Sequence, residues 1–178
     1  MSDLLMEYLR IFDSKTGGRV DLHPLHGADE LPGNSEVARI LAEFGHAVKL
    51  LPTIAAADKA ARRQWLADVI GNKNPDVRID DRLIGDIKTP NRSIAVKQAT
   101  INRCTYACAQ QKVAIAIINL VDREYAVRDI KNGIIGALQP GRNKTIQEVW
   151  VLTAQRNIFK INRAMVFDES IYEALSIL

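Results

Sequence analysis

The sequence predicts an α/β protein: a single-domain, three-layer sandwich in which helices flank a central mixed β-sheet. Three observations predict this class. The 178 residues fit one domain, since domains usually contain about 100–200 residues. Segments with helical spacing of apolar residues alternate along the chain with segments of strand character. Residues 113–121 form a nearly continuous run of Val, Ile and Ala, which is typical of a strand buried on both faces.

The first elements surround a Gly-Gly turn. Residues 4–12 and 19–22 flank this turn, which fits either a β-hairpin or a helix followed by a strand. After a loop, apolar residues at helical spacing predict a helix over residues 36–44, which Asn34 or Ser35 would cap.

A strand and a second helix follow before a short hairpin. Residues 46–51 are expected to form a strand that a proline ends, and residues 55–70 an alanine-rich helix. Residues 77–79 and 83–87 have the pattern of two short strands, and the Asp-Asp pair between them favours a tight turn.

The second half continues the alternation. Ser93 is expected to cap a long helix that ends near Gln111, directly before the buried strand. The remaining expected elements are a helix over residues 125–138, strands over residues 147–153 and 157–161, and a final helix over residues 169–178.

The net charge of +3 conceals an uneven distribution. Residues 1–86 carry 11 basic and 14 acidic side chains, whereas residues 87–121 carry five basic side chains and no Asp or Glu. Carboxylates and cations from these two stretches can face each other around an anionic ligand. A basic helix that simply faces solvent is the alternative explanation of the same pattern.

The main candidate for chemistry is a group of three charged residues. Asp76 begins the first strand of the expected hairpin, while Asp86 and Lys88 lie two apart on the second strand and so point to the same face. Two carboxylates and a main-chain carbonyl suit Mg²⁺, which takes one or two protein carboxylates and keeps several waters. A lysine beside the metal can position or deprotonate the attacking water. Ordinary surface charges on an edge strand would give the same short pattern.

The order of these residues resembles a known motif. Pro75-Asp76, nine residues, then Asp86-Ile87-Lys88 is similar to the motif of the PD-(D/E)xK nuclease superfamily, which has a restriction-endonuclease-like fold. The resemblance divides the chain into an N-terminal extension (residues 1–33), a catalytic core (residues 34–121) and a C-terminal completion of the same domain (residues 122–178).

One branch of the superfamily is the most similar. Residues 79–90 look most like the C-terminal nuclease modules of contact-dependent growth inhibition and related bacterial polymorphic toxins, many of which cut transfer RNA. Many members of that branch have Glu-x-Lys where this chain has Asp-x-Lys, which counts against the branch and not against the chemistry.

The resemblance implies a role for each matching residue. Asp76, Asp86 and the main-chain carbonyl of Ile87 would bind Mg²⁺, for which Mn²⁺ is a plausible substitute. Glu36 would contact the metal directly or through water. Lys88 would act on the water or on the transition state.

The resemblance also implies a nucleic-acid substrate and a partner. Gln98 would point toward the site from the helix after the motif. The leading hypothesis is a Mg²⁺-dependent endonuclease toxin that prefers RNA, particularly transfer RNA. It would act in the bacterial cytoplasm after delivery as the C-terminal part of a larger protein, and an immunity protein would bind its active-site face. The basic residues expected to contact phosphate are Arg92, Lys97, Arg103 and Lys112.

Two alternatives stay open. A DNA endonuclease of the restriction or repair type would carry the same motif, and a non-catalytic nucleic-acid or protein binding module could have the same fold. Membrane-spanning proteins are not favoured, because the longest apolar run is far shorter than the roughly 20 residues needed to cross a bilayer. The first seven residues lack the basic and apolar segments of a secretory signal.

Other metal-ligand types have weaker patterns. Cys104 and Cys108 lie four apart in a helical segment without a second pair or a nearby histidine, which favours a buried helix face over a zinc site. His23 and His26 lack a third ligand nearby. Tyr106 on the basic helix is a candidate for stacking on a base.

Overall fold

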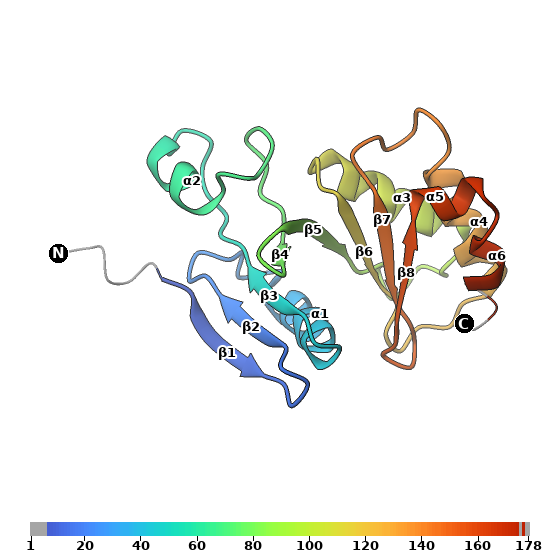
Figure 1. The fold of residues 1–178 in the computed structure, drawn as a ribbon, viewed down its shortest axis with the longest axis horizontal. Coiled ribbons are helices and arrows are strands. Elements are labelled where there is room, and N and C mark those ends of the chain that lie inside the picture. Colours follow the sequence, from blue (N-terminus) through green and yellow to red (C-terminus); the bar gives the residue numbers. More distant parts are fainter. Residues whose placement is uncertain (1–6, 175, 177–178) are drawn as a thin grey trace. The chain divides into compact units, whose positions relative to one another are not determined.

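The protein has an α/β fold with a mixed sheet, which confirms the fold class predicted from the sequence. The computed structural model describes residues 7–174 and 176. The strands follow one another in the sheet in chain order, from β1 to β8, and Figure 1 shows them with their helices. The residues divide into two compact units, Met1–Gly85 and Asp86–Leu178, and we describe each unit by itself.

The first unit starts with a hairpin, the first of the two arrangements that the Gly-Gly turn allowed. β1 and β2 pair antiparallel, β2 and β3 parallel, and β3, β4 and the start of β5 antiparallel. The elements are β1 (Leu9–Asp13), β2 (Arg19–Leu22), α1 (Leu31–Glu43), β3 (Ala47–Leu50), α2 (Lys59–Trp65), β4 (Val77–Ile79) and β5 (Leu83–Lys88), the last of which ends in the second unit.

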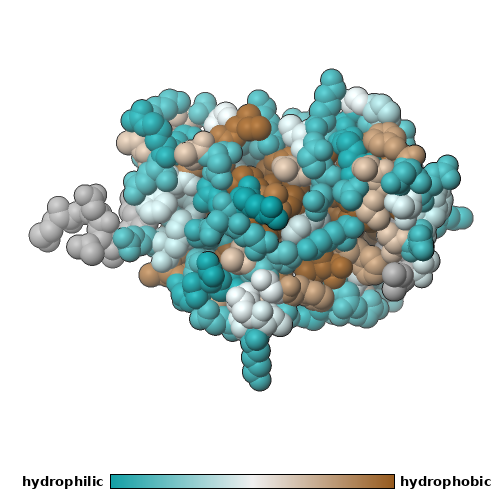
Figure 2. Space-filling model, viewed as in Figure 1, coloured by the Kyte–Doolittle hydropathy of each residue, from teal (hydrophilic) through white to brown (hydrophobic). Residues whose placement is uncertain are grey.

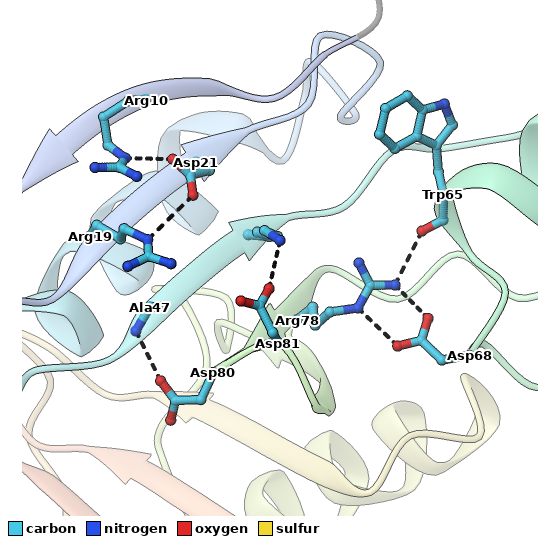
Figure 3. Close-up of polar contacts among 10 residues, drawn as sticks. Arg10, Arg19, Asp21, Ala47, Trp65, Asp68, Arg78, Asp80 and Asp81 are labelled. Carbon is cyan, nitrogen blue, oxygen red and sulfur yellow. Dashed lines mark hydrogen bonds and ion pairs between the residues drawn. The ribbon is translucent and has the colours of Figure 1, made fainter.

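Side chains alternate between the two faces of this part of the sheet, as expected for strands. The apolar residues on one face, such as Val48 on β3, are fully buried, and α1 packs against β2 and β3. The intervening positions carry charges that form ion pairs, among them Arg10 on β1 with Asp21 on β2 at 2.5 Å and Arg78 on β4 with Asp68 in the turn after α2 (Figure 3). The first unit therefore has an apolar face and a face of paired charges.

The β4–β5 hairpin has the expected turn. Asp80 and Asp81 have φ angles of 52° and 57°, a left-handed conformation that Asp tolerates better than most residues. Asp80 accepts a hydrogen bond from the Ala47 amide at 2.9 Å, and Asp81 pairs with Lys49 at 2.5 Å. These contacts fix the turn against β3.

Two helices of the first unit differ from their expected bounds. α1 begins at Leu31, not at residue 36, because Pro32 lies in its first turn, where the missing amide hydrogen is not needed. Asn34 is consequently a buried helical residue and not a cap. α2 is much shorter than the expected residues 55–70, since Asp58 caps it by accepting from the Ala61 amide at 3.0 Å.

The second unit contains the fully buried strand that the sequence predicted. Every residue of β6 is buried, and β6 pairs parallel with β7, which pairs antiparallel with β8. Gly133 permits close packing of α3 and α4, because a Cβ there would lie 2.5 Å from Cβ of Ile101. The elements are α3 (Gln98–Gln110), β6 (Ile115–Asn119), α4 (Val127–Ala137), β7 (Glu148–Leu152), β8 (Ile158–Asn162), α5 (Arg163–Phe167) and α6 (Ile171–Ala174).

The helix expected from Ser93 begins five residues later, at Gln98. Ser93 donates its amide to the side chain of Asn91 at 2.9 Å in a local turn, which competes with a helix. Arg123 then holds the segment in a non-helical path through the carbonyls of Pro90 and Ile94. Within the expected final helix over residues 169–178 the structure has the short α6, Ile171–Ala174, and α5, Arg163–Phe167, precedes it as a helix that the sequence analysis did not predict. Residues 4–6, 175, 177 and 178 of the expected elements lie outside the described residues.

The surface is predominantly hydrophilic on the face shown in Figure 2. Large exposed apolar side chains come from separate elements, for example Leu9 on β1 and Phe167 on α5, and single exposed apolar residues are normal on a protein surface. Within the described residues, no helix combines the length and the apolar character needed to cross a membrane.

Candidate metal centre and catalytic residues

Asp76 is held by a buried hydrogen-bond network of the first unit. It lies directly before β4 and is 5% exposed. Asn34 Nδ2 on α1 donates to Asp76 Oδ1 at 3.1 Å. His26 Nδ1 lies 2.6 Å from the carbonyl oxygen of Leu51, and its Nε2 lies 3.1 Å from Asn34 Nδ2. Because a carbonyl only accepts, His26 carries its proton on Nδ1 and accepts from Asn34 through Nε2.

The network closes on the main chain of Leu51. Its amide donates to the carbonyl of Asp76 at 2.9 Å, while its own carbonyl accepts from His26. Leu51 and Asn34 thus contact Asp76 through its backbone and its side chain, respectively. Buried hydrogen bonds of this kind restrict the orientation of a carboxylate.

Asp86 has a different environment, in the second unit. Its side chain is 2% exposed, and Oδ2 lies 2.6 Å from Lys88 Nζ. This contact confirms the prediction that the two side chains share one face of β5. The main-chain carbonyl of Asp86 accepts from the thiol of Cys108 on α3 at 3.3 Å. An ammonium group at this distance offsets much of the cost of burying a carboxylate.

The other predicted ligands are placed as follows. Ile87, whose carbonyl is the third predicted ligand, is a buried residue of β5. Glu36 is exposed on α1, two residues after Asn34. Asn34 is the site residue that the sequence analysis missed, because it was interpreted as a cap. Its spacing from Val37 and Ala38, both buried on α1, was the signal that places it on the inner face of the helix.

All four predicted phosphate contacts are exposed side chains of the second unit. Arg92 lies in the segment between β5 and α3, and Lys97 is the N-cap residue of α3, so the expectation that Lys97 lies inside the helix is wrong. Gln98 is the first residue of α3, where it is also exposed. Arg103 lies on α3, and Lys112 follows the C-cap residue Gln111 with a positive φ of 57°.

The chemistry of the donors fits Mg²⁺. Asp76 and Asp86 offer hard carboxylate oxygens, and Mg²⁺ usually takes only one or two protein carboxylates. Among the described residues, no three His, Cys, Asp or Glu side chains form a cluster that would hold a metal on protein ligands alone. Cys104 and Cys108 are free thiols on α3, and Cys108 is buried, as a cysteine on an apolar helix face would be.

The histidines outside the network have structural contacts. His23 packs edge-on against Tyr8 and Trp65, at ring-centroid distances of 5.1 and 4.8 Å. Burial raises the pKa of Tyr8 to about 12 and lowers the pKa of His23. Burial disfavours the charged form of each ring, so this cluster serves the packing of the first unit.

The comparisons with known proteins point to one fold. No protein-family model matches the chain, and no curated protein matches it by sequence. A chain from the solved "CdiA-CT/CdiI toxin and immunity complex from Burkholderia pseudomallei" is similar, with a TM-score of 0.53 and 21% sequence identity, over 78% of this chain and 91% of that chain. At this identity the similarity shows a shared fold.

Proposed function

We propose that this chain is a Mg²⁺-dependent endonuclease that hydrolyses phosphodiester bonds of RNA, with transfer RNA as the preferred substrate, and that it acts as a toxin inside bacterial cells. The observation that carries the proposal is the contact on β5 between the buried carboxylate of Asp86 and the partly exposed ammonium of Lys88, 2.6 Å apart. The fold shared with a chain of a toxin and immunity complex supports the toxin role, and the PD-(D/E)xK-like motif supports the chemistry.

The β4–β5 hairpin supports the choice of ligands. Its register pairs Val77 with Gly85, and in the sequence Asp76 directly precedes Val77 and Asp86 directly follows Gly85. In the proposed site Asp76, Asp86 and the carbonyl of Ile87 hold Mg²⁺, which when bound makes a water more acidic and offsets phosphate charge.

The protein's own residues would orient the reaction. The network of Asn34 and His26 would keep the carboxylate of Asp76 in place, while the ammonium of Lys88 would position the attacking water or stabilise charge on the phosphate. As the water loses a proton to solvent and its oxygen bonds to phosphorus, the ester bond on the opposite side breaks and the leaving oxygen takes up a proton from solvent. Exposed cations of the second unit, such as Arg103, would bind neighbouring phosphates.

Incubation of the purified protein with total RNA and with plasmid DNA, with Mg²⁺ or with EDTA, tests the proposal. We expect RNA cleavage that requires Mg²⁺ and is abolished in Asp86→Asn and Lys88→Met. The matched controls are Asp81→Asn and Lys49→Met, which break a surface pair of the same residue types at 2.5 Å and should leave the rate unchanged. Cleavage of DNA alone would instead indicate a DNA endonuclease of the restriction or repair type. Cleavage of neither substrate would contradict the nuclease proposal and favour a non-catalytic binding module.

Expression in bacterial cells tests the toxin role. We expect the wild-type chain to inhibit growth and Lys88→Met to be harmless at equal protein level. A protein encoded with the chain that binds it tightly and restores growth would be its immunity partner, and we expect it to be acidic because it would cover the basic second unit. Normal growth with abundant soluble wild-type protein would contradict the toxin role.

A further inference from the structure

The second unit contains a pocket of about 590 Å³ that the proposed hydrolysis does not use. Its walls are two short segments, residues 92–97 between β5 and α3 and residues 123–126 directly before α4. A volume of this size is typical of pockets for small organic ligands. The side chains that matter below are Arg92, Ile94, Lys97, Arg123, Glu124 and Tyr125.

The two walls are fixed to each other. Arg123 donates from one wall to the carbonyls of Pro90 and Ile94, at 2.7 and 2.6 Å. Val96 and Tyr125 form a parallel bridge between the segments, and the Tyr125 hydroxyl accepts from the Ala154 amide at 3.4 Å. Because the hydroxyl is engaged on the protein side, the ring is held in the lining and the pocket is formed before any ligand binds.

The lining combines cationic and apolar groups with one carboxylate, that of the exposed Glu124. Arg92 is exposed and forms no ion pair within the described part of the chain. Lys97 is 66% exposed in its side chain and reaches Asp129 at only 3.5 Å. Ile94 is 44% exposed and Tyr125 adds an aromatic ring. Such a lining is complementary to a nucleotide, because the phosphate binds to cations and the base stacks on a flat apolar or aromatic surface.

We propose that this pocket binds one unpaired nucleotide, with its base against Tyr125 and Ile94 and its phosphate at Arg92 and Lys97. The inference rests on the proposed RNA substrate and deepens it, because a base enters such a pocket only from single-stranded or looped RNA. Arg92 follows Lys88 by four residues, a span of at most about 14 Å. The bound nucleotide therefore lies close to Lys88 along the RNA strand.

Binding experiments with Asp86→Asn protein test the pocket without cleavage. The comparison is between Tyr125→Phe and Tyr125→Leu, both of which remove the hydroxyl, so only the ring differs. We expect Tyr125→Leu to bind a single-stranded RNA octamer roughly 5- to 100-fold more weakly than Tyr125→Phe. Binding of the same octamer in a duplex should not distinguish them. The control Tyr172→Leu, at an exposed tyrosine of α6, should change neither.

Free nucleoside monophosphates form a second arm of the experiment. A monophosphate that binds in a Tyr125-dependent manner and is displaced by the octamer would support a nucleotide of the RNA strand as the occupant. A monophosphate that the octamer does not displace would overturn the RNA source and leave a free nucleotide. Equal octamer affinity of Tyr125→Phe and Tyr125→Leu, or a loss at Tyr106→Ala instead, would overturn the pocket itself.

Ultraviolet cross-linking of octamers that contain 4-thiouridine covers the case in which a variant does not fold. On Asp86→Asn protein with native Tyr125 we expect cross-links to residues 92–97 or 123–126, and their absence would contradict the proposal. The experiments can overturn the nucleotide pocket and the RNA hydrolysis independently of each other. RNA cleavage without any Tyr125 ring effect would overturn only the pocket, and ring-dependent binding by a wild type that cleaves no RNA would overturn only the hydrolysis.

Discussion

Asp76 in the first unit and Asp86 in the second are both buried but are stabilised in different ways. Asp76 accepts from the neutral amide of Asn34 at 3.1 Å, whereas Asp86 has the ammonium of Lys88 at 2.6 Å. The amide donor has no formal charge, whereas the ammonium group partly neutralises the carboxylate beside it. In the proposed site Asp86 would therefore also keep Lys88 in position.

The two units also differ in how their charged surface residues are paired. Six ion pairs lie within the first unit, among them that of Arg78 on β4 with Asp68 in the turn after α2 (Figure 3). In the second unit exposed cations such as Arg103 and Lys112 have no ion pair within the described chain. Ion pairs are thus more frequent in the first unit, although exposed cations such as Arg63 and Arg82 have no ion pair there within the described residues.

The largest expected effect separates the two roles of Lys88. If Lys88 only neutralised Asp86, removing both charges would restore both the stability and the cleavage rate that the single variant loses. We expect Lys88→Met to lower the free energy of unfolding by about 2 kcal/mol, because Asp86 keeps a buried charge. The double variant Asp86→Asn/Lys88→Met should regain most of this stability in urea unfolding. Its RNA cleavage rate should stay about 10²- to 10⁴-fold below wild type, and recovery of the rate would contradict a catalytic role for the pair.

The element order and the Asp86–Lys88 contact follow from local sequence, because strand alternation alone places residues two apart on one face. The start of α3 does not follow from local sequence. Arg123, far along the chain, captures the carbonyls of Pro90 and Ile94 and keeps Ser93 out of the helix. The burial of Asn34, in contrast, could have been predicted from local sequence, because Asn34 lies three residues before Val37 on the same helix face. It was missed because asparagine is also a preferred helix cap.

The role of His26 could not be predicted from the sequence either. A pair of histidines three residues apart indicates only a weak metal site. In the structure His26 contacts the carbonyl of Leu51 and the amide of Asn34, and the three residues come from three different segments of the chain. Long-range hydrogen bonds of this kind depend on the finished fold. The sequence motif therefore identifies Asp76, whereas the groups that orient it appear only in three dimensions.

The variant Asn34→Asp tests whether neutral groups are required beside Asp76. It places a second carboxylate about 3 Å from the first, and like charges at that distance disfavour ionisation of both. We expect the free energy of unfolding to fall by about 1–3 kcal/mol at pH 8. The loss should shrink as pH falls, because one carboxyl takes up a proton in the folded state. Urea unfolding between pH 4.5 and pH 8 measures this.

Asn34→Leu is the matched control. It removes the donor without adding charge, so we expect a similar loss of stability that does not depend on pH over this range. If Asn34→Asp and Asn34→Leu gave the same pH profile, charge beside Asp76 would not matter and the contrast with Asp86 would not hold.

The salt dependence of RNA binding tests the contrast between the surfaces. On Asp86→Asn protein, the variants Arg103→Gln and Lys112→Gln should each reduce the slope of log affinity against log salt by about 0.7, the value for one single-strand phosphate contact. Arg10→Gln and Lys49→Gln, whose native side chains pair with aspartates in the first unit, should leave the slope unchanged. Equal effects in both units would show that internal pairing does not withhold the first unit's cations.

The smallest effect is the acid sensitivity of the first unit. Hydrogen bonds from Arg78 and Lys49 lower the pKa values of Asp68 and Asp81. A carboxylate with a lowered folded pKa stabilises the fold above its ordinary pKa of about 4, and this stability is lost as pH falls through the lowered value. Because both carboxylates are partly exposed, each pair should contribute less than about 1 kcal/mol.

Hydrogen exchange at pH 6 and pH 3 can detect this loss by region. After correction for intrinsic rates, we expect β3 and β4, which carry Lys49 and Arg78, to lose more protection at pH 3 than β6. Asp81→Asn should reduce that difference because its stabilising charge is already absent at pH 6. The control is Asp168→Asn in the second unit, where hydrogen bonds with Ser170 lower the pKa of Asp168; it should not change the exchange of β3 or β4. A uniform loss of protection in both units would mean that their different surface pairing has no energetic consequence in acid.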